Sequence, residues 1–296
     1  MYLDHFSLKE TPFDMQPNIK FYCPCDTHKQ AEQLIEYTVN NNDSITKITG
    51  PIGTGKTLLI DRIKSILPQK QTITILNPNC ETEHLINKIL MQLPTHNHEQ
   101  ASDLLAQLEK ALYLYAQDNK PVVLVIDEAQ SINPKALEVL RLYTNLQLNN
   151  RPVLQLILIG QPELNDLLQH PMMEQVAQRI NFSHTIQPLS LDEVRHYLHQ
   201  RINRSGPHKR VFWEKNSINL IYDASKGLPR HVNKVAHKAM MLAYFDSSHV
   251  VTQNHVFKAA QDSELTCRKP GISLLFQLTT LNTLLSAITA YIVFMR

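Results

Sequence analysis

The sequence of 296 residues is long enough to bury a sizeable core, as one large domain or as two smaller ones. Hydrophobic residues make up 43% of it and charged residues 19%, which is a globular composition and excludes an intrinsically disordered chain. The net charge is +2, from 29 basic and 27 acidic residues. This balance argues against a protein that works by neutralising the phosphates of a nucleic acid.

The N-terminal segment, residues 1–44, is interpreted as a leader followed by a first helix. Its opening residues include acids and no apolar stretch, so it is not a signal peptide. Cys23 and Cys25 lie close to His28, which raises the question of a metal site. No second Cys/His pair completes a tetrahedral ligand set, and four scattered cysteines make no disulfide framework. Reduced thiols are therefore expected.

Residues 45–189 alternate between predicted strands and predicted helices. The strands are short β-branched or leucine-rich runs at residues 45–49, 71–76, 121–127, 153–160 and, with a weaker pattern, 184–189. Helical patterns occupy residues 56–67, 82–93, 101–117 and 134–148. This alternation predicts an α/β core with a parallel sheet covered by helices on both faces.

From Ser190 to residue 264 the sequence predicts helices only. Ser190 and Glu193 have the spacing of a capping box, in which the hydroxyl accepts from the Glu193 N–H and the carboxylate reaches back to the cap. Helical patterns follow at residues 191–202, 215–225, 230–245 and 253–262. We expect a small all-helical domain after the α/β core.

Residues 272–295 form an uncharged apolar run that follows the basic pair Arg268 and Lys269. A bilayer is spanned by about 20 such residues, so this run predicts a transmembrane helix. The basic pair would place the main body in the cytoplasm, with only Arg296 beyond the span. Gln277 and several threonines weaken the pattern, so an apolar helix docked on the domain or on a partner stays open as the alternative.

A complete phosphate-binding loop follows the first predicted strand and begins a helix. Its residues are Gly50, Pro51, Ile52, Gly53, Thr54, Gly55, Lys56 and Thr57, with Leu58 next in the helix. Glycines allow backbone N–H groups to approach phosphate oxygens, and the helix N-terminus adds a positive dipole end. Lys56 supplies a positive charge at the β- and γ-phosphates, and the Thr57 hydroxyl is placed for Mg²⁺. The alternative, a glycine-rich connection with an exposed lysine, does not account for this pattern in this context.

Two adjacent carboxylates, Asp127 and Glu128, end the third predicted strand. Asp127 can hold Mg²⁺ through a bound water, and Glu128 can orient and deprotonate the water that attacks the γ-phosphate. The carboxyl ends of strands are where an open α/β sheet places its chemistry. An acidic helix cap would be a serious alternative by itself, but the pairing with the phosphate-binding loop favours ATP hydrolysis.

These motifs resemble the AAA+ ATPases, and more narrowly the general secretion pathway protein A type, which includes the ATPase of MSHA pilus biogenesis. The similar segments, in the family's order, are MYLDHFSLKETPFDMQPNIKFY, THKQAEQLIEYTV, GTGKTLL, VLVIDEAQ, LEVLRLYTNLQ, ILIGQPEL, AQRI and GLPRHVNKVAHKAM. The resemblance covers about residues 1–262. It implies a P-loop parallel-sheet core with a C-terminal helical lid.

The resemblance also implies roles for residues outside the two motifs. Gln161 would be the polar residue that senses the γ-phosphate, and Arg230 would be the lid arginine that reaches the nucleotide. Arg179 would be an arginine finger supplied to the neighbouring subunit's site, where it stabilises charge on the transferred phosphoryl group. Arg141 is a lesser alternative for the finger. Both Arg179 and Arg230 could instead be ordinary solvated or ion-paired side chains.

A finger supplied by a neighbour implies an ATP-dependent, ring-like homo-oligomer. The resemblance further implies a bacterial inner-membrane protein whose cytoplasmic ATPase helps to assemble a type II secretion system or a type IV pilus. Secretion-type relatives continue into a periplasmic peptidoglycan-binding domain, whereas this sequence ends at Arg296, so the pilus branch is the nearer expectation. A DNA-associated ATPase of the transposition-helper type and a nucleotide-dependent scaffold remain the alternatives. The near-neutral charge and the apolar run count against the first, and Glu128 counts against the second.

Overall fold

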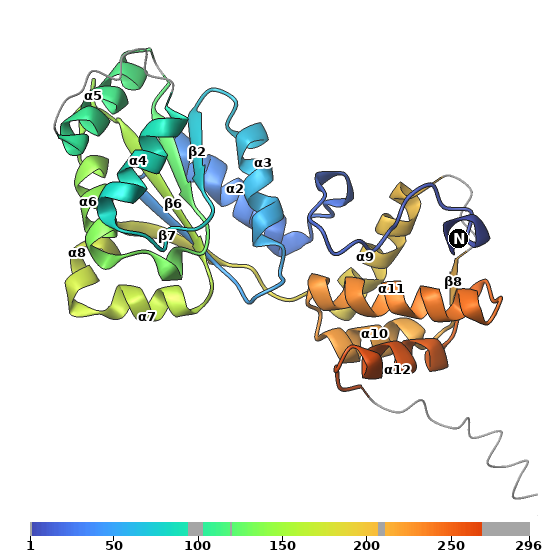
Figure 1. Cartoon of the computed structure of the whole chain (residues 1–296). Coiled ribbons are helices and arrows are strands. Elements are labelled where there is room, and N and C mark those ends of the chain that lie inside the picture. Colours follow the sequence, from blue (N-terminus) through green and yellow to red (C-terminus); the bar gives the residue numbers. More distant parts are fainter. Residues whose placement is uncertain (1, 94–102, 119, 207–210, 268–296) are drawn as a thin grey trace, which may run out of the picture.

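A parallel sheet of five strands forms one lobe of the protein, which we call the sheet lobe (Figure 1). The structure is a computed structural model that describes residues 2–93, 103–118, 120–206 and 211–267. The strands of the sheet are β1 (Ile45–Thr49), β2 (Gln71–Ile75), β3 (Val122–Ile126), β6 (Leu154–Gly160) and β7 (Ile180–Thr185). They lie in the order β2-β3-β6-β1-β7, and every neighbouring pair is parallel, which confirms the predicted parallel sheet.

Helices cover both faces of the sheet because the inner strands are buried on both sides. Along β3, Val122, Leu124 and Ile126 face one hydrophobic cluster, whereas Val123 and Val125 face the other. The first cluster is covered by α4 (Thr82–Gln92), α5 (Leu104–Gln117), α6 (Pro134–Thr144), α7 (Glu163–Gln169) and α8 (Glu174–Ala177), and the second by α2 (Asp26–Asn40) and α3 (Lys56–Ile66). Short 3₁₀ turns, η2 (Ala129–Ser131) and η3 (Pro171–Met173), connect β3 to α6 and α7 to α8.

Two predicted elements of the sheet lobe had wrong boundaries. The fifth strand was predicted at residues 184–189 but runs over Ile180–Thr185 (β7), because an edge strand has no continuous apolar run and alternates between half-buried and exposed residues. The helix predicted to reach residue 148 ends at Thr144, where a hairpin of β4 (Gln147–Leu148) and β5 (Arg151–Pro152) begins. Asn149 and Asn150 turn that hairpin with positive φ angles of 51° and 63°.

The second lobe, which we call the helical lobe, contains α9 (Leu191–Arg204), α10 (Ser217–Ser225), α11 (Pro229–Phe245) and α12 (Gln253–Asp262). The predicted capping box is confirmed: the Ser190 side chain accepts from the Glu193 N–H, and the Glu193 carboxylate accepts from the Ser190 N–H. The prediction of helices alone was wrong in one detail. A short parallel pair, β8 (Phe212–Trp213) and β9 (Val250–Val251), lies at the far end of this lobe (Figure 1).

The leader, residues 2–25, lies on the helical lobe although it precedes the sheet lobe in sequence (Figure 1). It contains α1 (Tyr2–His5) and the 3₁₀ turn η1 (Ile19–Phe21). Phe6, Leu8 and Phe13 are buried in the same hydrophobic cluster as the inner faces of α9 to α12. The chain therefore passes between the lobes twice, once from the leader into α2 and once from β7 into α9.

The second passage is held by a contact that needs a glycine. The Leu189 N–H donates to the Gly227 carbonyl at 2.8 Å, just before α9. Gly227 has φ +74°, and a Cβ there would lie 2.0 Å from the Leu189 carbonyl oxygen. Only glycine fits this close approach of two backbones. It fixes the turn between α10 and α11 against the connection from the sheet.

Within the described ranges, no helix combines the length and the apolar character needed to cross a membrane. The predicted transmembrane helix at residues 272–295 lies outside the described residues.

Candidate active site

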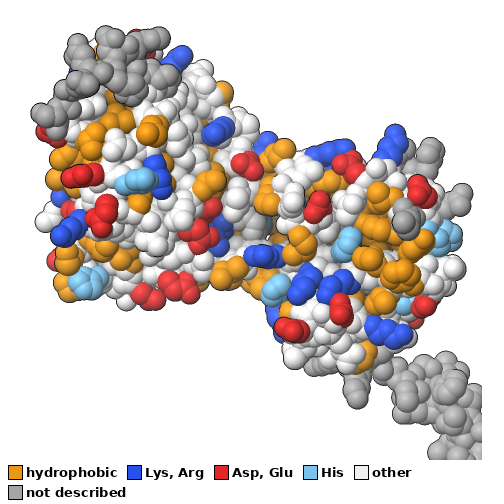
Figure 2. Space-filling model, viewed as in Figure 1, with side chains coloured by type: hydrophobic (Ala, Val, Ile, Leu, Met, Phe, Trp, Pro, Cys, Tyr) orange, Lys and Arg blue, Asp and Glu red, His pale blue; other side chains and the backbone are white. Residues whose placement is uncertain are grey.

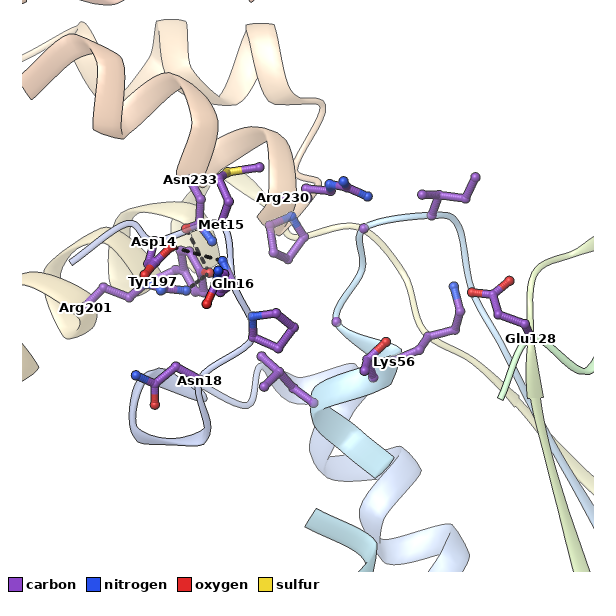
Figure 3. Close-up of a pocket in the computed structure, with 17 residues that line it drawn as sticks. Asp14, Met15, Gln16, Asn18, Lys56, Glu128, Tyr197, Arg201, Arg230 and Asn233 are labelled. Carbon is purple, nitrogen blue, oxygen red and sulfur yellow. Dashed lines mark hydrogen bonds between the residues drawn. The ribbon is translucent and has the colours of Figure 1, made fainter. Parts of the chain in front are cut away.

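A cavity of about 340 Å³ lies between the lobes, next to the carboxyl ends of β1 and β3 (Figure 3). Its described lining comes from the leader, the phosphate-binding loop, the end of β3 and the facing sides of α9 and α11. The lining residues are Asp14, Met15, Gln16, Pro17, Asn18, Ile52, Gly53, Gly55, Lys56, Thr57, Leu58, Glu128, Tyr197, Arg201, Pro229, Arg230 and Asn233. The sequence therefore brings the predicted loop, the predicted base and the predicted lid arginine to one cavity.

The phosphate-binding loop has the backbone that its glycines predict. Gly53 and Gly55 have φ angles of +82° and +98°, which are left-handed conformations that glycine adopts without strain. The helix α3 begins at Lys56 immediately after Gly55. Backbone N–H groups of this turn and the N-terminus of α3 are therefore available to an anion in the cavity.

Lys56 lies inside the loop with only 6% of its surface exposed. Its Nζ donates to the carbonyl oxygens of Gly50 at 2.7 Å and Pro51 at 2.9 Å. Burial lowers the pKa of Lys56, whereas the carboxylates of Glu128 and Asp127 act in the opposite direction. A further anion beside Lys56 would favour the charged form of the amine.

Asp127 and Thr57 lie together, as a shared metal site requires. The Thr57 hydroxyl hydrogen-bonds to the Asp127 carboxylate, which also accepts from the Glu128 N–H at 2.9 Å. Asp127 is only 4% exposed, and this burial raises its pKa. A carboxylate and a hydroxyl are oxygen donors that suit Mg²⁺, which keeps most of its waters and takes few protein ligands. Among the described residues, no cluster of three or more His, Cys, Asp or Glu side chains could hold a metal.

Glu128 follows Asp127 in a left-handed conformation, with φ +49°. Non-glycine residues adopt this conformation rarely, and it costs about 1 kcal/mol or more. In Figure 3 its carboxylate points toward the Lys56 amine across the mouth of the loop. The same carboxylate accepts hydrogen bonds from the side chains of Gln130 and Gln161. Gln161 thus lies at the end of β6 beside the predicted base, on the same edge of the sheet.

The predicted arginines occupy three different environments. Arg230 lines the cavity, and its backbone N–H donates to the Gly53 carbonyl at 3.2 Å, so the N-terminus of α11 contacts the loop of the same chain. Arg179 is exposed in the connection between α8 and β7 and is not one of the described residues that line this cavity. The Arg141 guanidinium is paired with the Glu138 carboxylate at 2.8 Å. This lesser candidate for the arginine finger is therefore already engaged in an ion pair within its own helix.

Comparison with known proteins agrees with this site. Residues 39–168 match the protein family described as AAA domain. Over 265 residues the chain is 32% identical to general secretion pathway protein A of Aeromonas hydrophila, covering 88% of this chain and 48% of that protein. The chain is an AAA+ protein of the P-loop ATPase class. The resemblance to the general secretion pathway protein A type is thereby confirmed, although the chain spans about half of that relative's length.

Solved structures confirm the AAA+ fold. The ORC2 protein of Aeropyrum pernix superposes with a TM-score of 0.64 at 18% identity, over 88% of this chain and 73% of that one. Cdc6p of Pyrobaculum aerophilum gives 0.65 at 14% identity, over 84% and 70%. The RuvB motor of Thermotoga maritima gives 0.54 at 18% identity, over 80% and 69%. At these identities the likeness concerns the fold alone.

The far end of the AAA+ cavity is built by residues that the sequence did not indicate. Leader residues 14–18 line this end together with a buried polar group from the helical lobe (Figure 3). In that group the Tyr197 hydroxyl donates to Asn233 at 3.0 Å and accepts from the buried Arg201 at 2.6 Å. Asn233 follows Arg230 by one helical turn on α11, and this spacing was the available signal. The leader's contribution to the cavity could not be predicted from the local sequence, because it depends on contacts between distant segments.

His28 packs against the AAA+ phosphate-binding loop and hydrogen-bonds to its backbone. Its Nε2 donates to the Thr54 carbonyl oxygen at 2.8 Å, and a Cβ on Gly55 would lie 3.2 Å from the same nitrogen. His28 is 4% exposed, and burial lowers its pKa, so the ring is held neutral. The sequence pointed to His28 only as a possible metal ligand beside Cys23 and Cys25, and the structure instead places it under the loop.

Proposed function

We propose that this AAA+ protein hydrolyses ATP with Mg²⁺ and uses the cycle to assist the assembly of a secretion system or a type IV pilus. The observation that supports hydrolysis is the convergence of Lys56, Glu128 and Arg230 on one cavity between the lobes, with Asp127 hydrogen-bonded to Thr57 in its lining. The identity of 32% to general secretion pathway protein A supports the process in which it acts.

In this proposal each residue has a separate part in the reaction. Backbone N–H groups of the loop and the Lys56 amine would hold the phosphates, and Thr57 and Asp127 would hold Mg²⁺, Asp127 through a water. The metal supplies charge stabilisation at the transferred phosphoryl group when it is bound. Glu128 takes a proton from the water that attacks the γ-phosphorus, and the bond to the ADP oxygen breaks. Arg230 contacts the γ-phosphate from the helical lobe, so loss of that phosphate removes this one link between the guanidinium and the nucleotide.

The exposed position of Arg179 supports a site shared between subunits. An arginine outside its own chain's cavity is available to a neighbour, where it would stabilise the charge that develops during phosphoryl transfer. We therefore propose a ring-like homo-oligomer that forms with ATP. Subunits carrying Arg179→Ala mixed with subunits carrying Glu128→Gln would test this. Partial recovery of turnover in the mixture is expected, because some interfaces regain both groups, and no recovery at any ratio would contradict a shared site.

The proposed location is the bacterial inner membrane, with the ATPase on the cytoplasmic side. Its basis is the uncharged run at residues 272–295 and the basic pair before it. Fractionation of cells that express the full chain would test the proposal. We expect the chain in the membrane fraction and resistant to carbonate extraction, and recovery in the soluble fraction would contradict it.

Steady-state ATPase activity of the full chain in detergent is the direct test of the enzyme. Lys56→Ala should abolish nucleotide binding. Glu128→Gln should still bind ATP but turn it over about 10²- to 10⁴-fold more slowly, because general-base catalysis typically contributes that factor. Equal turnover by wild type and Glu128→Gln would refute the enzyme assignment. In the source organism, secretion and piliation should be lost on deletion and restored by wild type but not by Lys56→Ala.

A DNA-associated ATPase is the second candidate, since two of the similar solved structures are described as an ORC1 protein in complex with DNA and as ORC bound to DNA. That likeness concerns the fold only. Acidic and basic side chains lie among one another on the face of the molecule shown in Figure 2, and the net charge is +2. A DNA-binding titration at several salt concentrations separates the two candidates. Tight, salt-dependent binding at moderate salt would favour the DNA-associated function.

A further inference from the structure

Two glutamine side chains and the Glu128 carboxylate form a closed set of hydrogen bonds behind the cavity. The Gln130 Nε2 donates to Glu128 Oε2 at 2.5 Å, and the Gln161 Nε2 donates to the same oxygen at 2.8 Å. The Gln130 Oε1 accepts from the backbone N–H of Gln161 at 3.0 Å. Each amide is thereby oriented, because the Gln130 carbonyl faces the backbone donor and its NH₂ group faces the carboxylate.

The position of Gln130 depends on the glycine that ends β6. A Cβ on Gly160 would lie 2.8 Å from the Gln130 Oε1, closer than side-chain carbons approach other atoms. Gly160 has no positive φ, so its backbone conformation does not itself require glycine. The missing side chain is needed instead as space for the Gln130 amide, which lies across the end of the strand.

We propose that Gln130 and Gln161 act together as a clamp on Glu128, and that Gln130 is a positioning residue for the hydrolysis proposed above. We call the hydrogen-bonded set of Gln130, Gln161 and Glu128 the glutamine clamp. Both donors bind Oε2, which leaves the second oxygen of Glu128 to accept the proton of the attacking water. In this arrangement Gln161 acts through Glu128, whereas the sequence led us to expect that it reads the γ-phosphate directly.

The backbone conformation of Glu128 leaves its side chain to be positioned by other residues. Glu128 is half-buried and lies in a left-handed conformation at the start of η2, so its own backbone does not fix the side chain on the cavity. A general base must lie within hydrogen-bond reach of the proton that it removes. A displacement of about 1 Å can lower a rate about 10²-fold. Two amide donors from two different elements restrict the carboxylate to one place.

Single-residue variants give the first test on the full chain. Gln130→Ala should lower kcat about 10- to 100-fold and leave the affinity for ATP within about twofold of wild type, because the clamp touches the base and not the nucleotide. Gln161→Ala should behave in the same way. Gln169→Ala, an exposed glutamine on α7, is the matched control and should keep wild-type kcat.

Combined variants test whether the groups act as a unit. The double variant Gln130→Ala/Gln161→Ala should be no slower than about the slower single variant, and neither glutamine substitution should slow Glu128→Gln further. Gly160→Ala should lower kcat in the wild-type background but have little effect beside Gln130→Ala, where the shorter side chain leaves room for the new methyl group. Independent, multiplying effects of Gln130→Ala and Gln161→Ala would overturn the clamp and favour direct sensing by Gln161.

The separation of kcat from the affinity for ATP is a signal that a merely structural role would not produce. Wild-type kcat in Gln130→Ala while Lys56→Ala and Glu128→Gln are inactive would overturn the clamp alone. Activity in those two variants would instead refute the proposed hydrolysis site.

Discussion

The backbone N–H of Arg230 donates to the carbonyl oxygen of Gly53 at 3.2 Å, so the first turn of α11 is joined directly to the phosphate-binding loop. Gly53 and Arg230 are also closely packed against each other. A Cβ on Gly53 would lie 2.9 Å from the Cβ of Arg230, and Gly53 has φ +82°. The loop and the helical lobe therefore fit each other only while residue 53 has no side chain.

Gly53→Ala should separate the loop from α11. The positive φ makes alanine unfavourable by about 1–2 kcal/mol, and the new methyl group pushes against Arg230. We expect ATP binding to weaken at least tenfold and the thermal midpoint to fall, measured by titration with a fluorescent nucleotide and by circular dichroism. Arg230→Ala is the comparison, because it keeps the backbone contact and should weaken ATP binding without lowering the midpoint. Wild-type affinity in Gly53→Ala would contradict this account of the interface.

His28→Ala should change both the loop and the pH dependence of stability. Loss of the donor leaves the buried Thr54 carbonyl unpaired, which costs about 1–3 kcal/mol. Burial also lowers the pKa of His28 below its ordinary 6.5, so below about pH 6.5 the unfolded state binds more protons than the folded state. The free energy of unfolding should therefore decrease as the pH falls below about 6.5 in wild type, down to the folded pKa.

Urea denaturation at several pH values measures that decrease. It should be smaller in His28→Ala and unchanged in His196→Ala, which removes an exposed histidine on α9. Identical slopes in wild type and His28→Ala would show that His28 is not held neutral by burial.

Asp127→Asn should stabilise the protein while it removes activity. Burial raises the pKa of Asp127 above its unfolded value, so the folded state binds more protons between those two values. Stability from this group is present at low pH and is lost as the pH rises through the folded pKa, and at neutral pH the ionised carboxylate destabilises the fold. The isosteric amide removes that cost. We expect a higher thermal midpoint at pH 7.5, with Mg²⁺-dependent turnover lost, whereas Asp61→Asn, an exposed carboxylate on α3, should change neither.

Cys23 should be the most reactive of the thiols Cys23, Cys25 and Cys267. A hydrogen bond from the Cys25 thiol, followed by the nearby guanidinium groups of Arg204 and Arg201, lowers the pKa of Cys23 to about 7, although burial acts against this. The hydrogen bond to Cys23, followed by burial, raises the pKa of Cys25, and burial raises the pKa of Cys267. Alkylation followed by peptide mass spectrometry should give a rate midpoint near pH 7 for Cys23. Cys25→Ala should move that midpoint upward, and a wild-type midpoint near 9 would contradict the hydrogen-bonded pair.

The sequence predicted the features that short stretches encode. The three inner strands β1, β3 and β6 were located to within a residue because burial on both faces gives continuous apolar runs, as in Val122–Ile126. The edge strand β2 was also located to within a residue. The loop glycines and the Asp127-Glu128 pair were read from local chemistry alone. The edge strand β7 was misplaced because its alternating residues carry a weaker signal than the apolar connection that follows it.

Contacts between distant segments could not be predicted from the sequence. Gln130 ends the VLVIDEAQ segment, yet no local pattern indicates that its amide reaches residue 161 across the end of β6. Leader residues 14–18 carry no nucleotide-binding pattern, and they reach the cavity because Phe6 and Phe13 are anchored in the helical lobe. Such placements depend on the folded arrangement of two lobes and have no periodicity of their own.

The double passage of the chain between the lobes has a mechanical consequence. The leader runs from the helical lobe past the nucleotide cavity into α2, and the connection after β7 returns to α9 near the Leu189–Gly227 contact. Two lobes joined by two connecting segments can rotate about the line through both connections. The same two connections restrict twisting and separation of the lobes. A motion driven by the proposed hydrolysis would therefore be a rotation of one lobe against the other about a single axis.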